Sequence, residues 1–486
     1  MNCPCRGPSG SETRPTTRRE FLASAGGGLG MLALSTLLAE EELVGREEGS
    51  LPPSGRRDRP PGAHHAPRAH SVIFLFMSGG PSHVDLFDPK PELSRLHGER
   101  LPPSFGAVKT RRGVEKNRLL ASKRTFSRHG AAGLEFSDFV PHMASCADDL
   151  CILRGMYGDS VTHPESVYLM NTGSILMGRP SLGSWVSYGL GTENRNLPSF
   201  VVMPDPKGWV KGGSPAWGSG YLPATHQATM VRGGASAIAN LSPPPGAAQV
   251  ESRRTQEFIQ KLNREHLRGR EDDPELEARI EAYELAFRMQ VHAPEAIDLA
   301  SETEATRRLY GLDRRETALF GARCLLARRL VERGVRFVQV YCGDTNGWDA
   351  HSDIESNHRA LCAESDLPVT GLLRDLKSRG LWDSTLVVWG GEFGRTPMSE
   401  GATGRDHNPH GFTVWLAGAG VKSGQAIGST DPLGLRAAEG RTHVHDLHAT
   451  ILHLLGFDHL RLTYPHNGRE ERLTDNAGQV IRAALA

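Results

Sequence analysis

A pattern of helix, glycine and apolar strand occurs twice between residues 315 and 389, and it constrains the fold more than any other feature. Leucines at helical spacing fill 315–333, the helix is expected to end at Gly334, and an apolar strand follows at 335–341. A second helical pattern ends at Gly380 and leads into an apolar strand at 386–389. This alternation is typical of a parallel sheet with crossover helices, so the sequence predicts an α/β fold with an open sheet.

Further strands are expected at 72–77, 150–153, 199–203 and 412–416, where short apolar runs are bounded by glycine, proline or polar residues. In open α/β sheets, binding sites lie outside the C-terminal ends of the strands. The functional residues are therefore expected where these strands end.

Residues 1–42 have the features of an export signal. Arg18 and Arg19, followed by Phe21-Leu22 and an apolar run, resemble a twin-arginine signal, although a chance Arg-Arg before a buried helix is the alternative. No clear cleavage site precedes Glu40, so an uncleaved N-terminal anchor stays open, and no other apolar run is long enough to span a membrane. We expect export by the twin-arginine pathway to the periplasm or cell envelope.

The rest of the chain divides into a linker and one domain. Residues 43–70 are rich in Pro, Arg and His and are expected to be a flexible linker, and 71–486 a single domain with a helical excursion at about 250–310. Lys+Arg 56 against Asp+Glu 56 leaves no net charge, which argues against a nucleic-acid partner. Five cysteines follow the signal, and the sequence does not show whether any of them pair.

Candidate metal ligands follow two of the predicted strands. Asp349 and His351 come after the strand at 335–341, and two residues spaced in this way in a loop can both turn toward one ion. His407 or His410 would complete a nitrogen and oxygen set suited to a divalent metal ion, with zinc favoured. A structural polar network is the alternative interpretation.

Glu392 and Arg395 follow the strand at 386–389, and no apolar periodicity continues after Gly390. Arg395 stands in a Gly-Arg-Thr-Pro loop, where it could hold an oxyanion bidentately or form a surface ion pair. Four later histidines are better explained by packing or capping than by metal binding: His443, His445, His448 and His453.

Four stretches, 73–91, 387–397, 406–412 and 444–456, resemble the DUF1501 family of exported and largely uncharacterised bacterial proteins. This family is numerous in planctomycetes, its members are often labelled sulfatase-like, and the resemblance extends from residue 71 to the end. It implies a fold of the alkaline phosphatase and sulfatase type, which is a three-layer α/β/α sandwich with a mostly parallel sheet and metal ligands at the strand ends.

The resemblance also implies roles for particular residues. His410 fits the late metal histidine of that superfamily, and Asp349 and His351 approximate the ligands of one metal site. Glu392 is a further candidate metal ligand, because it falls where an Asp-His pair is expected, with Phe393 in place of the histidine. A site for one metal ion is therefore expected rather than a site for two.

His163 lies about where sulfatases place a nucleophilic Cys or Ser and phosphatases a Thr or Ser. A histidine could attack phosphorus or bind metal, but it cannot become formylglycine, so sulfate ester hydrolysis by the usual sulfatase route is not expected.

Two functions are compatible with these residues. The first is an exported metal-dependent hydrolase of phosphate or sulfate esters, including those of polysaccharides, in which Arg395 holds the anionic oxygens and His163 is nucleophile or general base. The alternative is a non-catalytic envelope protein that keeps the fold and binds an anionic glycan or a protein partner. The sequence does not indicate an oligomeric state.

Overall fold

The computed structural model describes residues 61–232, 249–270, 273–343 and 346–486. By its contacts the chain divides into two units, Met1–Arg56 with Ser242–Asp273 and Arg57–Leu241 with Pro274–Ala486. The described part of the first unit holds helix α8 (Gln249–Leu267). The predicted export signal and most of the predicted linker lie outside the described residues, and the fold below is that of the second unit.

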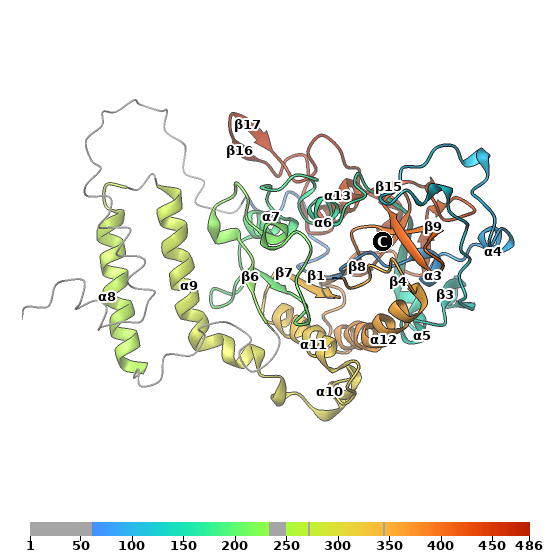
Figure 1. The fold of residues 1–486 in the computed structure, drawn as a ribbon. Coiled ribbons are helices and arrows are strands. Elements are labelled where there is room, and N and C mark those ends of the chain that lie inside the picture. Colours follow the sequence, from blue (N-terminus) through green and yellow to red (C-terminus); the bar gives the residue numbers. More distant parts are fainter. Residues whose placement is uncertain (1–60, 233–248, 271–272, 344–345) are drawn as a thin grey trace, which may run out of the picture. The chain divides into compact units, whose positions relative to one another are not determined.

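A nine-stranded sheet forms the centre of this unit (Figure 1). Its main path runs β12-β4-β11-β8-β1-β7-β5-β6, and β15 pairs with β4. The bounds of these strands are β1 Ser71–Met77, β4 Leu150–Tyr157, β5 Phe200–Met203, β6 Thr229–Met230, β7 Phe337–Cys342, β8 Thr385–Gly390, β11 Phe412–Gly418, β12 Gln425–Ile427 and β15 Thr442–His443.

The sheet is mostly parallel. β1 pairs in parallel with β7 and β8, β7 with β5, and β4 with β12 and β15, whereas β11 runs antiparallel to β8 and to β4. The C-terminal ends of β1, β4, β7 and β8 and the N-terminal end of β11 therefore lie at one edge. The prediction of an α/β fold with a mostly parallel sheet is confirmed.

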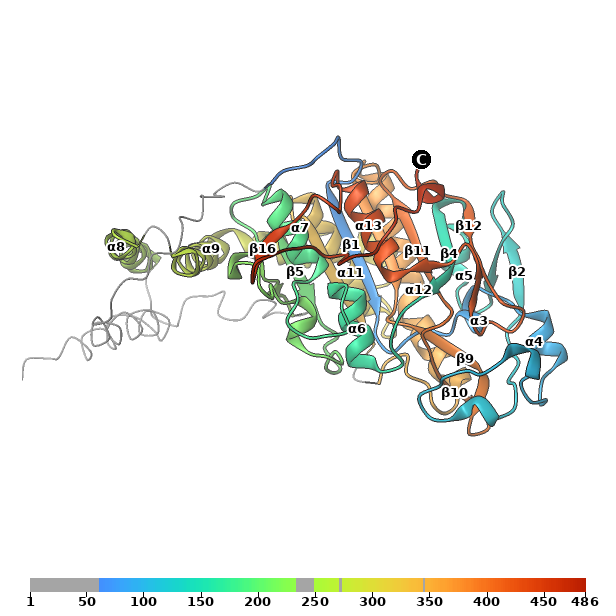
Figure 2. The same cartoon turned by 90° about the horizontal axis from the view of Figure 1, so that it is seen from above.

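Both faces of the sheet are covered by helices, because β1 alternates its side chains between two apolar clusters. Ile73, Leu75 and Met77 pack in the cluster that includes α11 (Ala318–Glu332) and α12 (Ile354–Ser378). Phe74 and Phe76 pack in the other, with α6 (His163–Thr172), α7 (Leu182–Leu190) and α13 (Val444–Leu454). The result is the expected three-layer α/β/α sandwich, which Figure 1 shows from the side and Figure 2 from above, through the layer of α6, α7 and α13.

Smaller elements surround these layers. They are α3 His83–Leu86, α4 Pro91–Arg95, β2 Phe126–His129, β3 Leu134–Ser137, α5 Pro141–Ala144, α9 Pro274–Ile297, α10 Glu304–Leu309, β13 Ser429–Thr430, β14 Ala437–Glu439, β16 Tyr464–His466 and β17 Arg469–Glu471. The expected helical excursion at about 250–310 thus corresponds to α8, α9 and α10, and α9 contributes Met289, Ala293 and Ala296 to the core.

The stretch after β8 does not stay a polar loop. It forms a hairpin of β9 (Gly394–Glu400) and β10 (Gly404–Asn408), in which Arg395 stands opposite His407. Both residues are buried although no apolar periodicity surrounds them, because the hairpin packs across the edge where the strands end.

The five cysteines of the described residues are buried and free. Among the described helices, none combines the length and apolar character that a membrane span requires.

Candidate metal centre

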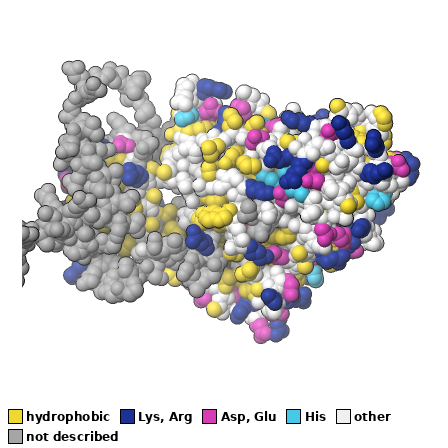
Figure 3. Space-filling view, in the orientation of Figure 1, with side chains coloured by type: hydrophobic (Ala, Val, Ile, Leu, Met, Phe, Trp, Pro, Cys, Tyr) yellow, Lys and Arg dark blue, Asp and Glu magenta, His cyan; other side chains and the backbone are white. Residues whose placement is uncertain are grey.

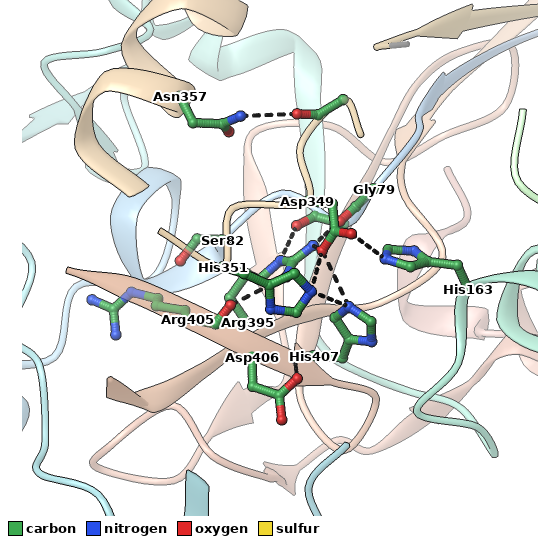
Figure 4. Close-up of polar contacts among 12 residues, drawn as sticks. Gly79, Ser82, His163, Asp349, His351, Asn357, Arg395, Arg405, Asp406 and His407 are labelled. Atoms are coloured by element: carbon green, nitrogen blue, oxygen red, sulfur yellow. Dashed lines mark hydrogen bonds and ion pairs between the residues drawn. The ribbon is translucent and has the colours of Figure 1, made fainter. Parts of the chain in front are cut away.

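Polar side chains from three segments meet at the edge where β1, β4, β7 and β8 end (Figure 4). His163 is the first residue of α6, which follows β4, and Asp349 and His351 lie in the loop after β7. His407 lies on β10, just before β11. One ligand atom from each of these four residues lies within 4.8 Å of the others.

The Asp349 carboxylate is the centre of this cluster. Its Oδ1 lies 2.9 Å from His351 Nε2 and 3.1 Å from His407 Nε2, and its Oδ2 lies 2.9 Å from His163 Nε2. Burial by itself would raise the pKa of Asp349, but hydrogen bonds from the three histidines, when their Nε2 atoms carry a proton, and the charge of Arg395 outweigh burial and hold the pKa well below its ordinary value. Asp349 is therefore ionised at neutral pH.

The three histidines each place Nδ1 against a fixed acceptor. The pairs are His163 with Glu392 Oε1 at 2.7 Å, His407 with the Val161 carbonyl oxygen at 2.6 Å, and His351 with Glu400. Ionised carboxylates and carbonyl oxygens only accept hydrogen bonds, so these acceptors favour the tautomer with the proton on Nδ1 and the lone pair on Nε2. Anchoring of the second ring nitrogen in this way is typical of metal-binding histidines.

The resulting Nε2 lone pairs converge. His351 Nε2 and His407 Nε2 are 3.1 Å apart, and burial lowers the pKa of His407 to about 3, so this ring is neutral at pH 7. The buried His163 Nε2 has no hydrogen-bond partner among the described residues, since its contact with Asp349 lacks hydrogen-bond geometry. Electron-rich atoms held this close repel one another unless a cation or a proton lies among them.

This donor set fits a divalent metal ion. Three imidazole nitrogens and one carboxylate oxygen are ligands that zinc accepts in a four-coordinate site, and imidazole also suits copper, iron and nickel. The residues that could hold the ion are His163, Asp349, His351 and His407.

Arg395 is fully buried, and its guanidinium is committed to the protein. It donates to Asp349 Oδ1 at 2.8 Å, to the carbonyl oxygen of Gly80 at 2.9 Å, and to the carbonyl oxygens of Gly79 and Arg405. A guanidinium has five N–H donors, so these bonds leave one, whereas a bidentate grip on an oxyanion needs two. Arg395 therefore positions Asp349 instead of a substrate, which differs from the sequence prediction.

Gly79 connects β1 to this site. Its N–H donates to Glu392 Oε1 at 3.0 Å and to Oε2 at 3.2 Å, and its carbonyl oxygen accepts from Arg395. Its φ is +110°, and a Cβ added there would lie 2.6 Å from the Asp349 backbone nitrogen. Only glycine allows the loop with Asp349 to approach the end of β1 so closely.

Two predicted ligands lie outside the four-residue cluster. Glu392 is buried behind His163 and orients that ring. His410 places Nε2 3.3 Å from the carbonyl oxygen of Lys109, so of the two histidines left open by the sequence, the structure brings His407 into the cluster and not His410.

Two side chains of the site were not predicted from the sequence. Lys211 Nζ lies 2.5 Å from Asp349 Oδ2, yet it comes from a Gly- and Pro-rich segment with no apolar pattern around it. Glu400, which holds His351, ends β9 just before the turn at Gly401. The two glycines that flank this turn, Gly401 and Gly404, could have indicated the hairpin.

The family model described as "Protein of unknown function (DUF1501)" matches residues 69–485. No curated protein matches the sequence. Among solved structures, the lipoteichoic acid synthase LtaP from Listeria monocytogenes is 10% identical, with 86% of this chain and 77% of that chain covered and a TM-score of 0.36. The PsFucS1 sulfatase from Pseudoalteromonas sp. is 13% identical, with 91% and 72% covered and a TM-score of 0.33. The phosphonate monoester hydrolase SpPMH from Silicibacter pomeroyi is 12% identical, with 71% of each chain covered and a TM-score of 0.32. These likenesses are too distant to transfer a function.

Proposed function

This chain belongs to the DUF1501 family, whose function is unknown, and from the geometry of its site we propose that it is a metal-dependent hydrolase of phosphate or sulfate esters. The observation that supports the proposal most strongly is the convergence of three histidine Nε2 atoms on one partly buried carboxylate, with each Nδ1 held by an acceptor. A structural network of histidines does not need every ring turned to the same tautomer.

Four residues of the site are proposed to bind the metal ion, and their neighbours orient them. His163, Asp349, His351 and His407 are the proposed ligands, and zinc is the favoured ion. When bound, the ion supplies Lewis-acid chemistry, either on an ester oxygen or by lowering the pKa of water. The sequence prediction of His163 as nucleophile or general base gives way to a ligand role here, because Glu392 engages its Nδ1 and its Nε2 lies within the ligand group.

Lys211 takes the place that the sequence suggested for Arg395. Its side chain is partly exposed, and its Nζ contacts Asp349 Oδ2. A cation at the border between the buried carboxylate and solvent is placed to meet the negative oxygens of a substrate. Lys211 is therefore the proposed oxyanion-binding residue.

The second candidate is a non-catalytic protein that binds an anionic glycan or a protein partner through the same edge of the fold. The observation that favours it is the ion pair between Lys211 and Asp349, which, with Arg395 on the other carboxylate oxygen, gives Asp349 two cationic partners from the protein itself. In this case the histidine cluster would be a structural network.

Metal analysis of the purified chain, combined with a panel of phosphate and sulfate monoesters, separates the two. We expect a bound divalent ion, turnover that chelation abolishes and metal restores, and loss of metal in Asp349→Ala and His407→Ala. His453→Ala, a histidine of α13 outside the cluster, is the matched control and keeps its metal. A metal-free protein without turnover would rule out the hydrolase, and bound metal without turnover would favour the binding protein.

We also propose that the protein is exported by the twin-arginine pathway to the periplasm or cell envelope, as the paired Arg18-Arg19 supports. A reporter fused after residue 70 should reach the periplasm in the wild type, and it should stay in the cytoplasm when both arginines are changed to lysine.

A further inference from the structure

The segment that connects α4 to β2 brings positive charge to the edge that holds the metal centre. Within residues 109–118 the chain has five basic residues and one acidic residue, although the net charge of the whole protein is zero. The basic residues are Lys109, Arg111, Arg112, Lys116 and Arg118. Such a local excess forms a positive surface in an otherwise balanced protein.

This segment is fixed in place. The backbone N–H of Arg112 donates to Asp406 Oδ2 at 2.7 Å, and the Arg436 guanidinium donates to the carbonyl oxygens of Phe105 and Ala107 at 2.6 Å each. Val114 is buried in a cluster with residues of β9 and of the loop before β14. The charges are therefore presented on an ordered backbone, which lowers the entropy that binding a ligand would cost.

Lys109 and Arg111 are the two cations of this segment whose charges act on Glu165, in the first turn of α6. Both are exposed, and neither forms a hydrogen bond or an ion pair through its side chain within the described ranges. Arg112, in contrast, pairs with Glu400 at 3.0 Å. Two exposed cations that are two residues apart in the chain can bind one anion together, because their mutual repulsion falls when a negative group lies between them.

The position of Lys109 and Arg111 follows from their neighbours, which are His410 and the first turn of α6. The Lys109 carbonyl oxygen lies 3.3 Å from His410 Nε2, three residues beyond His407. The pKa of Glu165 is lowered by hydrogen bonds from Ser160 and Thr162 and then by the charges of Arg111 and Lys109, and Glu165 lies in the first turn of α6, which begins with His163. On the face shown in Figure 3, Lys and Arg side chains lie around a group of His and acidic side chains.

We propose that Lys109 and Arg111 bind a second anionic group of a ligand whose first anionic group lies at the metal centre. The ligand is then a carbohydrate chain that carries several sulfate or phosphate groups, and not a small monoanion. The placement of the first anionic group at the metal centre depends on the proposed function. The second subsite depends only on the charges and contacts of residues 109–118.

Nucleic acid fits these observations less well than a sulfated or phosphorylated glycan. Proteins that bind nucleic acid need a broad positive surface along a closely spaced row of phosphates, and domains of this type are usually strongly basic. Here the net charge is zero. Two exposed cations on this segment and a separate inner cation, Lys211 at Asp349, suit charges that are separated by uncharged sugar units.

The test is the binding of heparin, a sulfated polysaccharide, to the full chain and to two double variants. Lys109→Ser/Arg111→Ser removes the proposed subsite. Arg68→Ser/Lys422→Ser removes the same charge from exposed positions just before β1 and just after β11, which is the opposite edge of the sheet. The dissociation constant is measured at several salt concentrations, together with metal content, thermal unfolding, and the affinity for inorganic sulfate.

We expect heparin to bind the Lys109→Ser/Arg111→Ser protein about tenfold more weakly, since each exposed ion pair contributes up to about 1 kcal/mol. Its salt dependence should also be shallower. Inorganic sulfate affinity, metal content and melting temperature should stay at wild-type values, and the control pair should bind heparin like the wild type.

An equal loss in both variants, or no loss in either, would overturn the proposal, as would an oligonucleotide that binds the wild type as tightly as heparin does. Heparin binding does not depend on turnover. A protein with no esterase activity but with heparin binding that requires Lys109 and Arg111 would refute the hydrolase and keep this subsite. Esterase activity, together with heparin binding that does not require Lys109 and Arg111, would support the hydrolase and refute this subsite.

Discussion

Glu392→Gln tests whether His163 offers its Nε2 lone pair to a metal ion. Glu392 is buried, its Oε1 lies 2.7 Å from His163 Nδ1, and both of its oxygens lie within 3.2 Å of the Gly79 nitrogen. A glutamine of the same shape should keep its amide oxygen on the Gly79 N–H, because a buried donor without an acceptor is costly. The NH₂ group then faces His163 Nδ1, and the ring moves its proton to Nε2.

The expected result is weaker metal binding with little change in the stability of the metal-free protein. Loss of a group that orients a ligating histidine typically weakens metal affinity about 10- to 100-fold, which corresponds to about 1.4 to 2.8 kcal/mol. In the metal-free variant the Nε2–H can turn to Asp349 Oδ2, which is 2.9 Å away, and thus replace the contact that is lost.

The assay is a zinc titration against a fluorescent chelator, with thermal unfolding of the metal-free proteins alongside. Glu471→Gln is the matched control, because Glu471 is a mostly buried carboxylate that pairs with Arg179 outside the ligand groups. An unchanged zinc dissociation constant in Glu392→Gln would refute the tautomer argument. A large drop in the melting temperature of the metal-free variant would instead show that Glu392 acts mainly in folding.

Four other perturbations have defined outcomes. Arg395→Met leaves Asp349 and three carbonyl oxygens without their donor, so denaturant unfolding should show a loss of about 3–5 kcal/mol; a loss below about 1 kcal/mol would contradict the positioning role. Lys211→Met should raise KM for an anionic ester about tenfold with metal content unchanged, and an unchanged KM would remove Lys211 from substrate binding. Chelation should lower the melting temperature, because free metal at about 100 times its dissociation constant contributes about 2.7 kcal/mol, and His453→Ala should respond like the wild type. Burial lowers the pKa of His448 to about 3, so the stability from its neutral ring is present above about pH 6.5 and is lost as the pH falls from there toward 3. The unfolding free energy of His448→Gln should therefore fall less between pH 7 and pH 4 than that of the wild type, by up to about 3 kcal/mol, and parallel curves would contradict this.

Six strands of the sheet were predictable because each one is a local apolar run, whereas the polar strands β9 and β10 were not. The runs at 72–77 and 386–389 correspond to β1 and β8, and a continuous apolar run such as 72–77 is typical of a strand buried on both faces. The direction of β11 was not predictable, since the residue pattern of an apolar strand does not depend on whether its neighbours are parallel or antiparallel. That direction places the chain before β11, including His407, at the same edge as Asp349.

In the candidate site, too, some features were predictable from the sequence and others were not. Asp349, His351 and His407 could be named from residue type and from their position after or before a strand, because those features are local. The sequence also named Glu392, His410 and Arg395, yet the structure turns Glu392 and Arg395 toward other residues of the site and leaves His410 beside Lys109. Residue type alone does not state which partner a side chain meets.

The sequence by itself thus determined the α/β class, the six apolar strands of the sheet, and the edge of the sheet at which the polar residues gather. Only the tertiary structure decided which histidines share Asp349, which acceptor holds each Nδ1, and that Lys211 reaches the same carboxylate. The physical reason is that secondary structure follows from periodicities within a few residues. The lone pairs of a metal site are aimed by hydrogen bonds between residues far apart in the chain, such as His163 and Glu392.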